Sequence, residues 1–342
     1  MNLLDLSLNQ LNDYAVKLNL PRFRGKQIFD ALYMAKSLEE ASNLSKEIKE
    51  KIKDDYPTWK IVKILESDDG TKKMALSLSD GSVVESVLLK YKYGYTVCVS
   101  TQVGCRMGCK FCASTIGGLK RNLSAGEILL QVLIYNRILG GNLKDRKVTN
   151  VVLMGCGEPL DNYENVAKFL QLISSESSLN ISQRNISLST CGIVKNIYRL
   201  ADDGFNVTLT ISLHAPTDEI RKKIMPTANS FSIEEILKAC DYYFSKTGRR
   251  VVFEYALIDG VNSTAGDMHT LAKVLHGRSC HVNLIPLNSV EEQKLEGVPR
   301  KRAYYLCEVL NKDGISATVR RTMGEDIEGA CGQLRNKIGG GA

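Results

Sequence analysis

Apolar residues recur at two different periods along the chain, and the change of period divides the chain into segments. In residues 1–55 the apolar positions Leu11, Tyr14, Ala15 and Leu18 follow the spacing of one helix face, and Pro21 separates two helical regions. Residues 58–90 contain β-rich runs separated by the turn signals Asp-Asp-Gly and Asp-Gly. These residues predict a small antiparallel meander.

From residue 95 onward, short apolar runs alternate with segments of helical character. This alternation is typical of a parallel sheet with helices on its outside. The predicted fold is therefore α/β, a partial, TIM-like (β/α)6 barrel with an N-terminal helical domain and a small β meander. The predicted strands are residues 95–100, 148–155, 185–190, 206–213, 250–258 and 280–286.

The same patterns predict where the chain divides. We expect an N-terminal helical accessory domain in residues 1–56, a meander linker in 57–90, the partial barrel in 91–324 and a C-terminal tail in 325–342. The end of the tail, Gly-Gly-Gly-Ala, is expected to be mobile.

The composition of the chain indicates which class of protein it is and in which compartment it is expected. A hydrophobic content of 44% against 24% charged residues is ordinary for a globular protein. No apolar run reaches the roughly 20 residues that span a bilayer, and Asp5 lies where a signal peptide needs positive charge. We therefore expect a cytoplasmic protein without membrane association. The net charge of +7 permits a nucleic-acid partner, but a lysine-rich solvated surface gives the same value.

Ten cysteines in such a compartment are not expected to form a disulfide framework. Cys105, Cys109 and Cys112 stand at the spacing C-x3-C-x2-C, which arises by chance roughly once in a hundred chains of this kind. Three thiolates in one loop can converge on one centre and leave a coordination position open. Two interpretations remain, an iron–sulfur cluster or a structural zinc ion closed by a fourth ligand such as Cys98. The spacing differs from the paired C-x2-C of zinc ribbons, which favours the cluster.

Polar and glycine-rich residues follow the predicted strands at their carboxyl ends, where parallel α/β folds gather functional residues. Any one of these segments could be an ordinary turn, but together, beside the cysteine loop, they predict a cofactor pocket. A glycine at 157 would let the backbone approach a ligand. These strand-end segments include Gly157, Glu158, Ser189, Ser212, Leu213, His214 and Asn288, the residues to which the family resemblance described below assigns cofactor contacts.

The cysteine loop followed by a partial barrel resembles the radical S-adenosylmethionine (SAM) superfamily. The segments VCVSTQVGCRMGCKFCAS, VVLMGCGEPLDNYENV, SLSTCGIV and ACGQLR are similar to the RlmN family, the dual-specificity adenine C2-methyltransferases of 23S rRNA and tRNA. The resemblance covers nearly all of residues 85–335. It implies formation of 2-methyladenosine in the peptidyl transferase centre and in tRNA at the adenine 3′ of the anticodon.

The resemblance also implies cofactors and partners. It implies a 4Fe-4S cluster on Cys105, Cys109 and Cys112, two SAM molecules per turnover bound by the strand-end residues, and an RNA-binding role for residues 1–56. An external flavodoxin-like electron donor, a thiol reductant and a monomeric protein are further expectations. Five cations flank the two cysteine regions and predict a positive rim for RNA: Lys110, Lys120, Arg121, Arg320 and Arg321.

Three residues outside the loop receive catalytic roles from the resemblance. Cys331 would carry a methyl group on sulfur, and Cys98 would be the resolving thiol that leaves a Cys98–Cys331 disulfide. Glu85 would be the proton acceptor, although the residues alone predict an exposed carboxylate on a strand. Cys156 stands where the family usually has methionine, and its thiol would lie close to the cofactor.

Two alternatives stay open. A Cfr-type enzyme would methylate carbon 8 of adenine in 23S rRNA, but GEPLDN at 157–162 and STCG at 189–192 resemble the C2 enzymes. A zinc-stabilised RNA-binding protein without catalysis is the alternative from another functional class.

Overall fold

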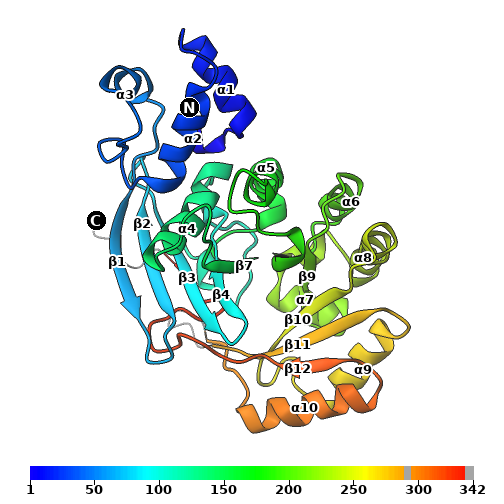
Figure 1. Ribbon diagram of the computed structural model, residues 1–342. Helices are drawn as coiled ribbons and strands as arrows, with labels where there is room; N and C mark the ends of the chain where they lie inside the picture. Colours follow the sequence, from blue (N-terminus) through cyan, green and yellow to red (C-terminus); the bar gives the residue numbers. More distant parts are fainter. Residues whose placement is uncertain (289–293, 336–342) are drawn as a thin grey trace.

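A ten-stranded sheet organises the computed structural model, which describes residues 1–288 and 294–335 (Figure 1). Strands β1 to β4 are antiparallel, and β4 continues into a parallel series through β7 to β12. The carboxyl ends of the parallel strands therefore share one rim. In sheet order the strands are β1 (Lys60–Glu66), β2 (Lys72–Ser77), β3 (Val83–Tyr91), β4 (Gly94–Cys98), β7 (Val148–Leu153), β8 (Ile186–Thr190), β9 (Thr208–Ser212), β10 (Val251–Leu257), β11 (Cys280–Pro286) and β12 (Ala317–Val319).

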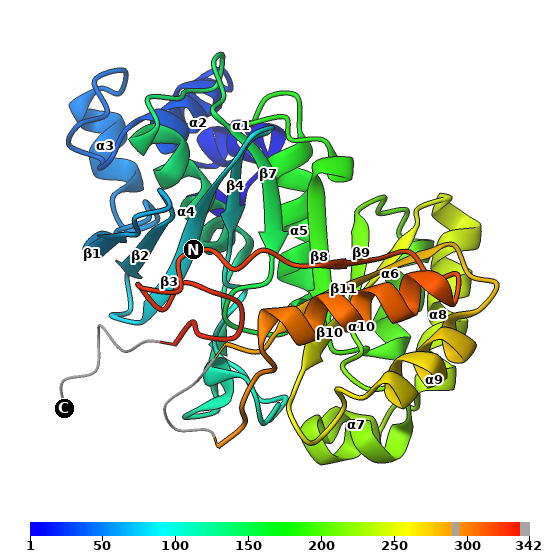
Figure 2. The same ribbon diagram turned by 90° about the horizontal axis from the view of Figure 1, so that it is seen from below.

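Helices cover the outer side of the parallel strands (Figures 1 and 2). Three of them begin with a capping box that is readable in the sequence as Ser-Ala-Gly-Glu, Ser-Ile-Glu-Glu and Thr-Ala-Gly-Asp. These boxes satisfy the first backbone N–H groups of α4, α8 and α9. The outer helices are α4 (Ala125–Ile138), α5 (Tyr163–Ser174), α6 (Val194–Asp202), α7 (Asp218–Ile224), α8 (Ile233–Thr247), α9 (Ala265–Leu275) and α10 (Arg300–Lys312).

The N-terminal helices α1 (Leu8–Lys17), α2 (Arg24–Met34) and α3 (Lys46–Ile52) form a separate layer (Figure 1). The segment before α1 packs on α4, where the backbone N–H of Gly126 donates to Asp5 Oδ1 at 2.6 Å. A Cβ on Gly126 would lie 2.6 Å from Leu4 Cβ, so this contact requires glycine. Because α4 is covered on both sides, nearly all of its residues are buried.

The six predicted parallel strands are confirmed, as are the three strands of the meander. The meander is not separate, however, because β3 pairs with β4 and extends the barrel sheet. The predicted strands did not include β12 or the hairpin of β5 (Gln102–Gly104) and β6 (Leu119–Asn122). In the described part of the chain, no helix combines the length and apolar character needed to cross a membrane.

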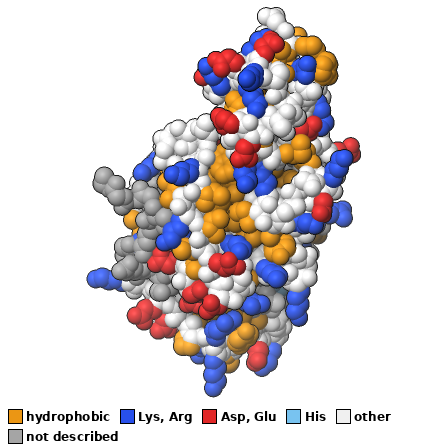
Figure 3. All heavy atoms as spheres, turned by 60° about the vertical axis from the view of Figure 1, so that its left-hand side comes forward, with side chains coloured by type: hydrophobic (Ala, Val, Ile, Leu, Met, Phe, Trp, Pro, Cys, Tyr) orange, Lys and Arg blue, Asp and Glu red, His pale blue; other side chains and the backbone are white. Residues whose placement is uncertain are grey.

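Strand β1 forms an edge of the sheet and leaves two apolar side chains accessible. Val62 and Ile64 are 43% and 39% exposed. On the face shown in Figure 3, apolar side chains gather below the N-terminal helices with lysine and arginine side chains around them. Lys60 and Lys63 lie exposed on the same strand, and charged edge residues of this kind oppose pairing with another chain.

The C-terminal segment, residues 323–335, returns across the meander to the cysteine loop (Figure 2). Ser67 Oγ donates to Asp326 Oδ1 at 2.6 Å, and Ser114 Oγ donates to the carbonyl of Leu334 at 2.8 Å. These contacts bring Cys331 beside a loop more than 200 residues earlier in the chain. The Gly-Gly-Gly-Ala end, predicted to be mobile, lies outside the described residues.

Candidate active site

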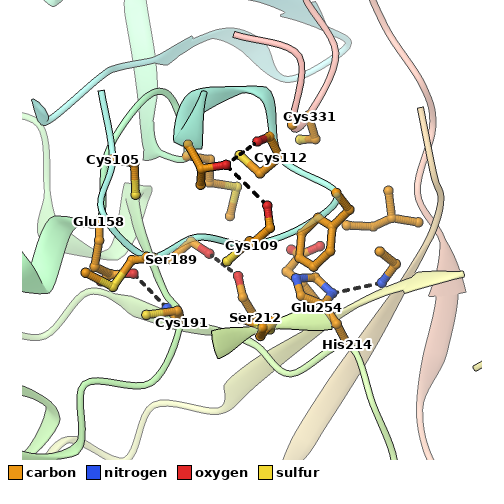
Figure 4. Close-up of a pocket in the computed structure, with 18 of the residues that line it drawn as sticks. Cys105, Cys109, Cys112, Glu158, Ser189, Cys191, Ser212, His214, Glu254 and Cys331 are labelled. Carbon is orange, nitrogen blue, oxygen red and sulfur yellow. Dashed lines mark hydrogen bonds between the residues drawn. The ribbon is translucent and has the colours of Figure 1, made fainter. Parts of the chain in front are cut away.

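A cavity of about 930 Å³, partly open to solvent, lies at the carboxyl ends of the parallel strands (Figure 4). The cysteine loop, the strand ends and the C-terminal segment all contribute to its wall. The predicted residues that line it are Cys105, Cys109, Cys112, Gly157, Glu158, Ser189, Ser212, His214, Asn288 and Cys331.

The thiols of Cys105, Cys109 and Cys112 line this one cavity. Burial raises the pKa of the Cys105 thiol to about 12 and also raises the pKa values of Cys109 and Cys112. A bound metal must therefore displace protons from them. Among the described residues, no group of three or more Cys, His, Asp or Glu side chains is placed to hold one ion. An iron–sulfur cluster distributes its cysteines over separate irons, so three thiols on one cavity wall fit such a cluster with one open iron.

Two glycines allow close contacts that hold the cysteine loop in place. Gly104 has φ +79°, and a Cβ there would lie 1.9 Å from the carbonyl oxygen of Gly118. Gly157 has φ +109°, and a Cβ there would lie 2.7 Å from Gln102 Cβ. The glycine at 157 is therefore required by protein packing, in addition to the ligand approach predicted from the sequence. Strand β7 and the cysteine loop are fixed against each other at this point.

Glu158 follows β7 and presents a fixed carboxylate to the cavity. Oε1 accepts from the backbone N–H of Leu160 at 3.0 Å, and Oε2 accepts from that of Cys191 at 2.7 Å. Burial raises the pKa of this carboxyl. Each carboxylate oxygen has a further lone pair, so Glu158 can still accept from a cationic ligand group. The hydroxyls of Ser189 and Ser212 lie 3.4 Å apart on the neighbouring strands.

His214 lies just beyond β9 in a left-handed backbone conformation, with φ +57°. Its Nδ1 accepts from the backbone N–H of Ala256 at 2.9 Å, which assigns the ring proton to Nε2. Burial, with a contribution from the nearby Arg221, lowers the pKa of the imidazole to about 3. His214 is therefore a neutral donor at this rim, and its ring packs edge-to-face with the Phe111 ring, with the two ring centroids 4.8 Å apart.

The lowered pKa of His214 predicts a pH dependence of stability. The unfolded imidazole binds a proton near pH 6.5, whereas the folded one resists protonation until about pH 3. Stability should therefore fall as the pH drops through this window, by about 2 kcal/mol from this group at pH 5. Guanidinium unfolding at pH 7.5 and pH 5 should show this loss in the wild type and a smaller loss in His214→Gln. Equal losses in the two proteins would contradict the assignment.

Sequence reasoning missed Glu254 and Arg320 as cavity residues. Glu254 on β10 is 4% exposed, and its Oε2 lies 3.4 Å from Nη1 of Arg320. Its Oε1 accepts from Asn283 Nδ2 at 3.1 Å. The available signal was a carboxylate within the apolar run VVFEYALI. Arg320 was assigned to an RNA-facing rim, but it lines the cavity wall instead.

A second, smaller cavity adjoins the first and is lined in part by Cys98. Cys331 lines both cavities, and its carbonyl accepts from Asn288 Nδ2 at 3.0 Å. Burial, and secondly the neighbouring Cys331, raise the pKa of Cys98 to about 12. All ten cysteines are free thiols, so the implied Cys98–Cys331 disulfide is absent from this structure.

Glu85 is not the exposed carboxylate that the residues alone predicted. It lies on β3, is 1% exposed and lines neither cavity. Its Oε2 accepts from the backbone N–H of Arg335 at 2.7 Å, and Lys73 Nζ lies 3.8 Å from Oε1. Burial raises the pKa of Glu85. The exposure prediction was wrong because the C-terminal segment covers this strand.

Two further residues lie away from the cavity wall. Leu213 is fully buried and does not line the cavity, because side chains alternate where β9 ends between Ser212 and His214. Cys156 is also buried outside the lining, and its backbone N–H donates to Ser100 Oγ at 2.9 Å. The thiol at 156 therefore lies behind the cavity wall, not in it.

The predicted positive rim is weaker than the sequence suggested. Arg121 pairs with Asp80 at 2.6 Å and with Glu127 at 2.8 Å, and Arg320 pairs with Glu254. Three of the five cations remain exposed: Lys110, Lys120 and Arg321.

Comparisons with known proteins agree with this geometry. Residues 99–271 match the family model of the radical SAM superfamily, and residues 1–56 match that of the ribosomal RNA large subunit methyltransferase N-terminal domain. A probable dual-specificity RNA methyltransferase RlmN from Clostridium perfringens is 50% identical over 98% of this chain and 96% of the relative. One from Clostridium novyi is 50% identical over 98% and 97%. The crystal structure of a radical SAM methyltransferase from Sphaerobacter thermophilus superposes with a TM-score of 0.93 at 40% identity, covering 98% of this chain and 99% of that one.

Proposed function

Since the chain belongs to the radical SAM superfamily and, within it, to the RlmN family of RNA methyltransferases, we propose that it methylates carbon 2 of adenine in 23S rRNA and in tRNA. Its targets would be the peptidyl transferase centre and the adenine 3′ of the anticodon. The placement of Cys331 carries the proposal. It lies at the boundary between the cavity with three loop thiols and the cavity with Cys98.

The cofactors fit the donor groups of the first cavity. Cys105, Cys109 and Cys112 would hold a 4Fe-4S cluster, and the strand-end residues, Glu158 among them, would bind SAM. When bound, the cluster and SAM supply a methyl group and a carbon radical, the chemistry that an unreactive aromatic carbon requires. Two SAM molecules would be used per turnover.

Within the protein, Cys331 would accept the methyl group on Sγ and lose one hydrogen atom from it to the carbon radical. The remaining carbon would bond to carbon 2 of adenine, and the adduct would return one electron and release the proton of carbon 2. Cys98 would then attack Sγ of Cys331. The S–S bond forms as the bond between Sγ and the base-attached carbon breaks, that carbon takes up a proton and becomes the new methyl group, and a thiol reductant later returns two electrons to the disulfide. The disulfide is thus a product of turnover. Glu85 is the proposed proton acceptor. Because it is 1% exposed and lines neither cavity, the C-terminal segment that contacts it would have to move first.

The cellular setting is proposed on the same basis. We place the protein in the cytoplasm as a monomer that meets 23S rRNA, tRNA, a flavodoxin-like electron donor and a thiol reductant. A membrane has no part in the proposed reaction.

Product analysis tests the function. RNA from a strain that lacks and then regains this protein should gain 2-methyladenosine in both RNAs by mass spectrometry. Appearance of 8-methyladenosine instead would establish the Cfr-type alternative. Anaerobic reconstitution should load iron and sulfide and release 5′-deoxyadenosine, whereas uptake of zinc alone would support a non-catalytic RNA-binding protein.

Cys98→Ala should trap a covalent complex. Without the Cys98 thiol, the bond between Cys331 and the base cannot be cleaved, so protein linked to RNA should accumulate under turnover conditions. Denaturing gel electrophoresis with labelled RNA measures the adduct. Cys240→Ala, a buried thiol outside both cavities, is the control and should form none. Free product at wild-type rate from Cys98→Ala would remove Cys98 from the mechanism.

A further inference from the structure

A tyrosine pair marks the hairpin that joins β3 to β4. The sequence at the turn is Lys90-Tyr91-Lys92-Tyr93-Gly94, and Tyr91 pairs with Gly94 across it. The rings of Tyr91 and Tyr93 stack with centroids 5.0 Å apart and an interplanar angle of 6°. Tyr93 is 65% exposed, which is unusual for so large a ring. The hairpin therefore presents an aromatic face to solvent.

The position of this pair connects it to the chemistry. Tyr91 lines the second cavity together with Cys98 and Cys331, so its ring belongs to the cavity wall, and the exposed ring of Tyr93 stacks against it. A Cβ on Gly94 would lie 2.6 Å from Thr149 Oγ1, so the turn packs tightly against the barrel. The turn that carries the stack is therefore held against the barrel.

The side chains around the tyrosine pair carry positive charge, which is complementary to a polyanion such as RNA. Lys90 and Lys92 are exposed and alternate with the tyrosines, and Arg321 is exposed beside the same cavity. Aromatic side chains stack on unpaired nucleobases of any sequence, and neighbouring cations bind the phosphates between them. A loose apolar patch or a lysine cluster alone would provide only one of these features.

We propose that Tyr93 is a stacking platform for an unpaired RNA base beside the target adenine, with Lys92 bound to the adjacent phosphate. The inference rests on the proposed function, because it takes RNA as the ligand. It adds a residue that holds the extruded strand at the second cavity. Continued stacking from Tyr91 through Tyr93 to the base offsets part of the cost of unstacking the RNA.

Binding of a stem-loop RNA with 2-aminopurine in its loop tests the proposal. The reconstituted enzyme is used with SAM but without reductant, so the RNA is not methylated. Tyr93→Ala should weaken binding roughly 5- to 150-fold and reduce 2-aminopurine quenching. Tyr93→Phe should bind like the wild type. Tyr304→Ala, which removes a 52% exposed tyrosine on α10, is the matched control and should also bind like the wild type.

Lys92→Ala supplies an independent measurement. It should lower the slope of log affinity against log salt by roughly 0.7, the value for one phosphate contact on a single strand. Wild-type affinity and quenching in Tyr93→Ala would overturn the stacking role while leaving the methyltransferase proposal standing. A wild-type enzyme that binds no RNA and forms no methyladenosine would overturn both.

Discussion

Cys331→Ala should abolish RNA methylation while leaving the iron and sulfide content unchanged. The thiol at 331 lines both cavities, whereas the three loop thiols lie in the first cavity only. Loss of the 331 thiol would remove the proposed acceptor for the methyl group but none of the proposed cluster ligands. The expected product yield is zero rather than reduced, because direct transfer to carbon 2 of adenine has no reactive nucleophile.

Two measurements check this expectation. Intact-protein mass spectrometry should find an S-methyl group on the wild type after incubation with SAM and none on Cys331→Ala. Product analysis should find no 2-methyladenosine. Cys307→Ala is the matched control, because Cys307 lies on α10 away from both cavities with 8% exposure. Residual 2-methyladenosine from Cys331→Ala would disprove a methyl-cysteine mechanism.

The parts of this structure that the sequence predicts are those that local patterns determine. Each of the six parallel strands is a short apolar run between turn signals, and side-chain periodicity suffices to find it. The cysteine loop can also be found from the sequence, since its three cysteines, Cys105, Cys109 and Cys112, lie close together in the chain. The rule that functional residues follow parallel strands placed Glu158, Ser189 and His214 correctly on the cavity wall.

The parts that the sequence did not predict depend on partners distant in the chain. Glu254 sits within an apolar run, and only the return of Arg320 beside it explains a carboxylate there. Glu85 alternates on its strand like a solvent-facing residue, yet the C-terminal segment buries it from 250 residues away. Strand β12 has three residues, too few for a period to be visible. Local pattern carries no information on such contacts.

Arg221 is the clearest case of a residue whose role only the structure reveals. In the sequence it is one charge in the helix DEIRKKI, which indicates a solvated face. In the structure it is fully buried, and its guanidinium donates to the carbonyls of Cys191 at 2.6 Å, Leu213 at 3.2 Å and Phe231 at 3.2 Å. It thereby ties the ends of β8 and β9, whose next residues form the cavity rim.

Arg221→Met should destabilise the protein by about 3 kcal/mol, because the buried carbonyls lose charge-assisted hydrogen bonds that methionine cannot replace. Guanidinium unfolding measures this change. Arg199→Met, which removes an exposed arginine from the neighbouring helix α6, should leave the unfolding midpoint near that of the wild type. Arg221→Lys keeps a positive charge but only one donor group, so its unfolding midpoint should fall between that of Arg221→Met and that of the wild type. If Arg221→Met unfolded like the wild type, the carbonyls would have found other donors, and the rim of the site would not depend on this side chain.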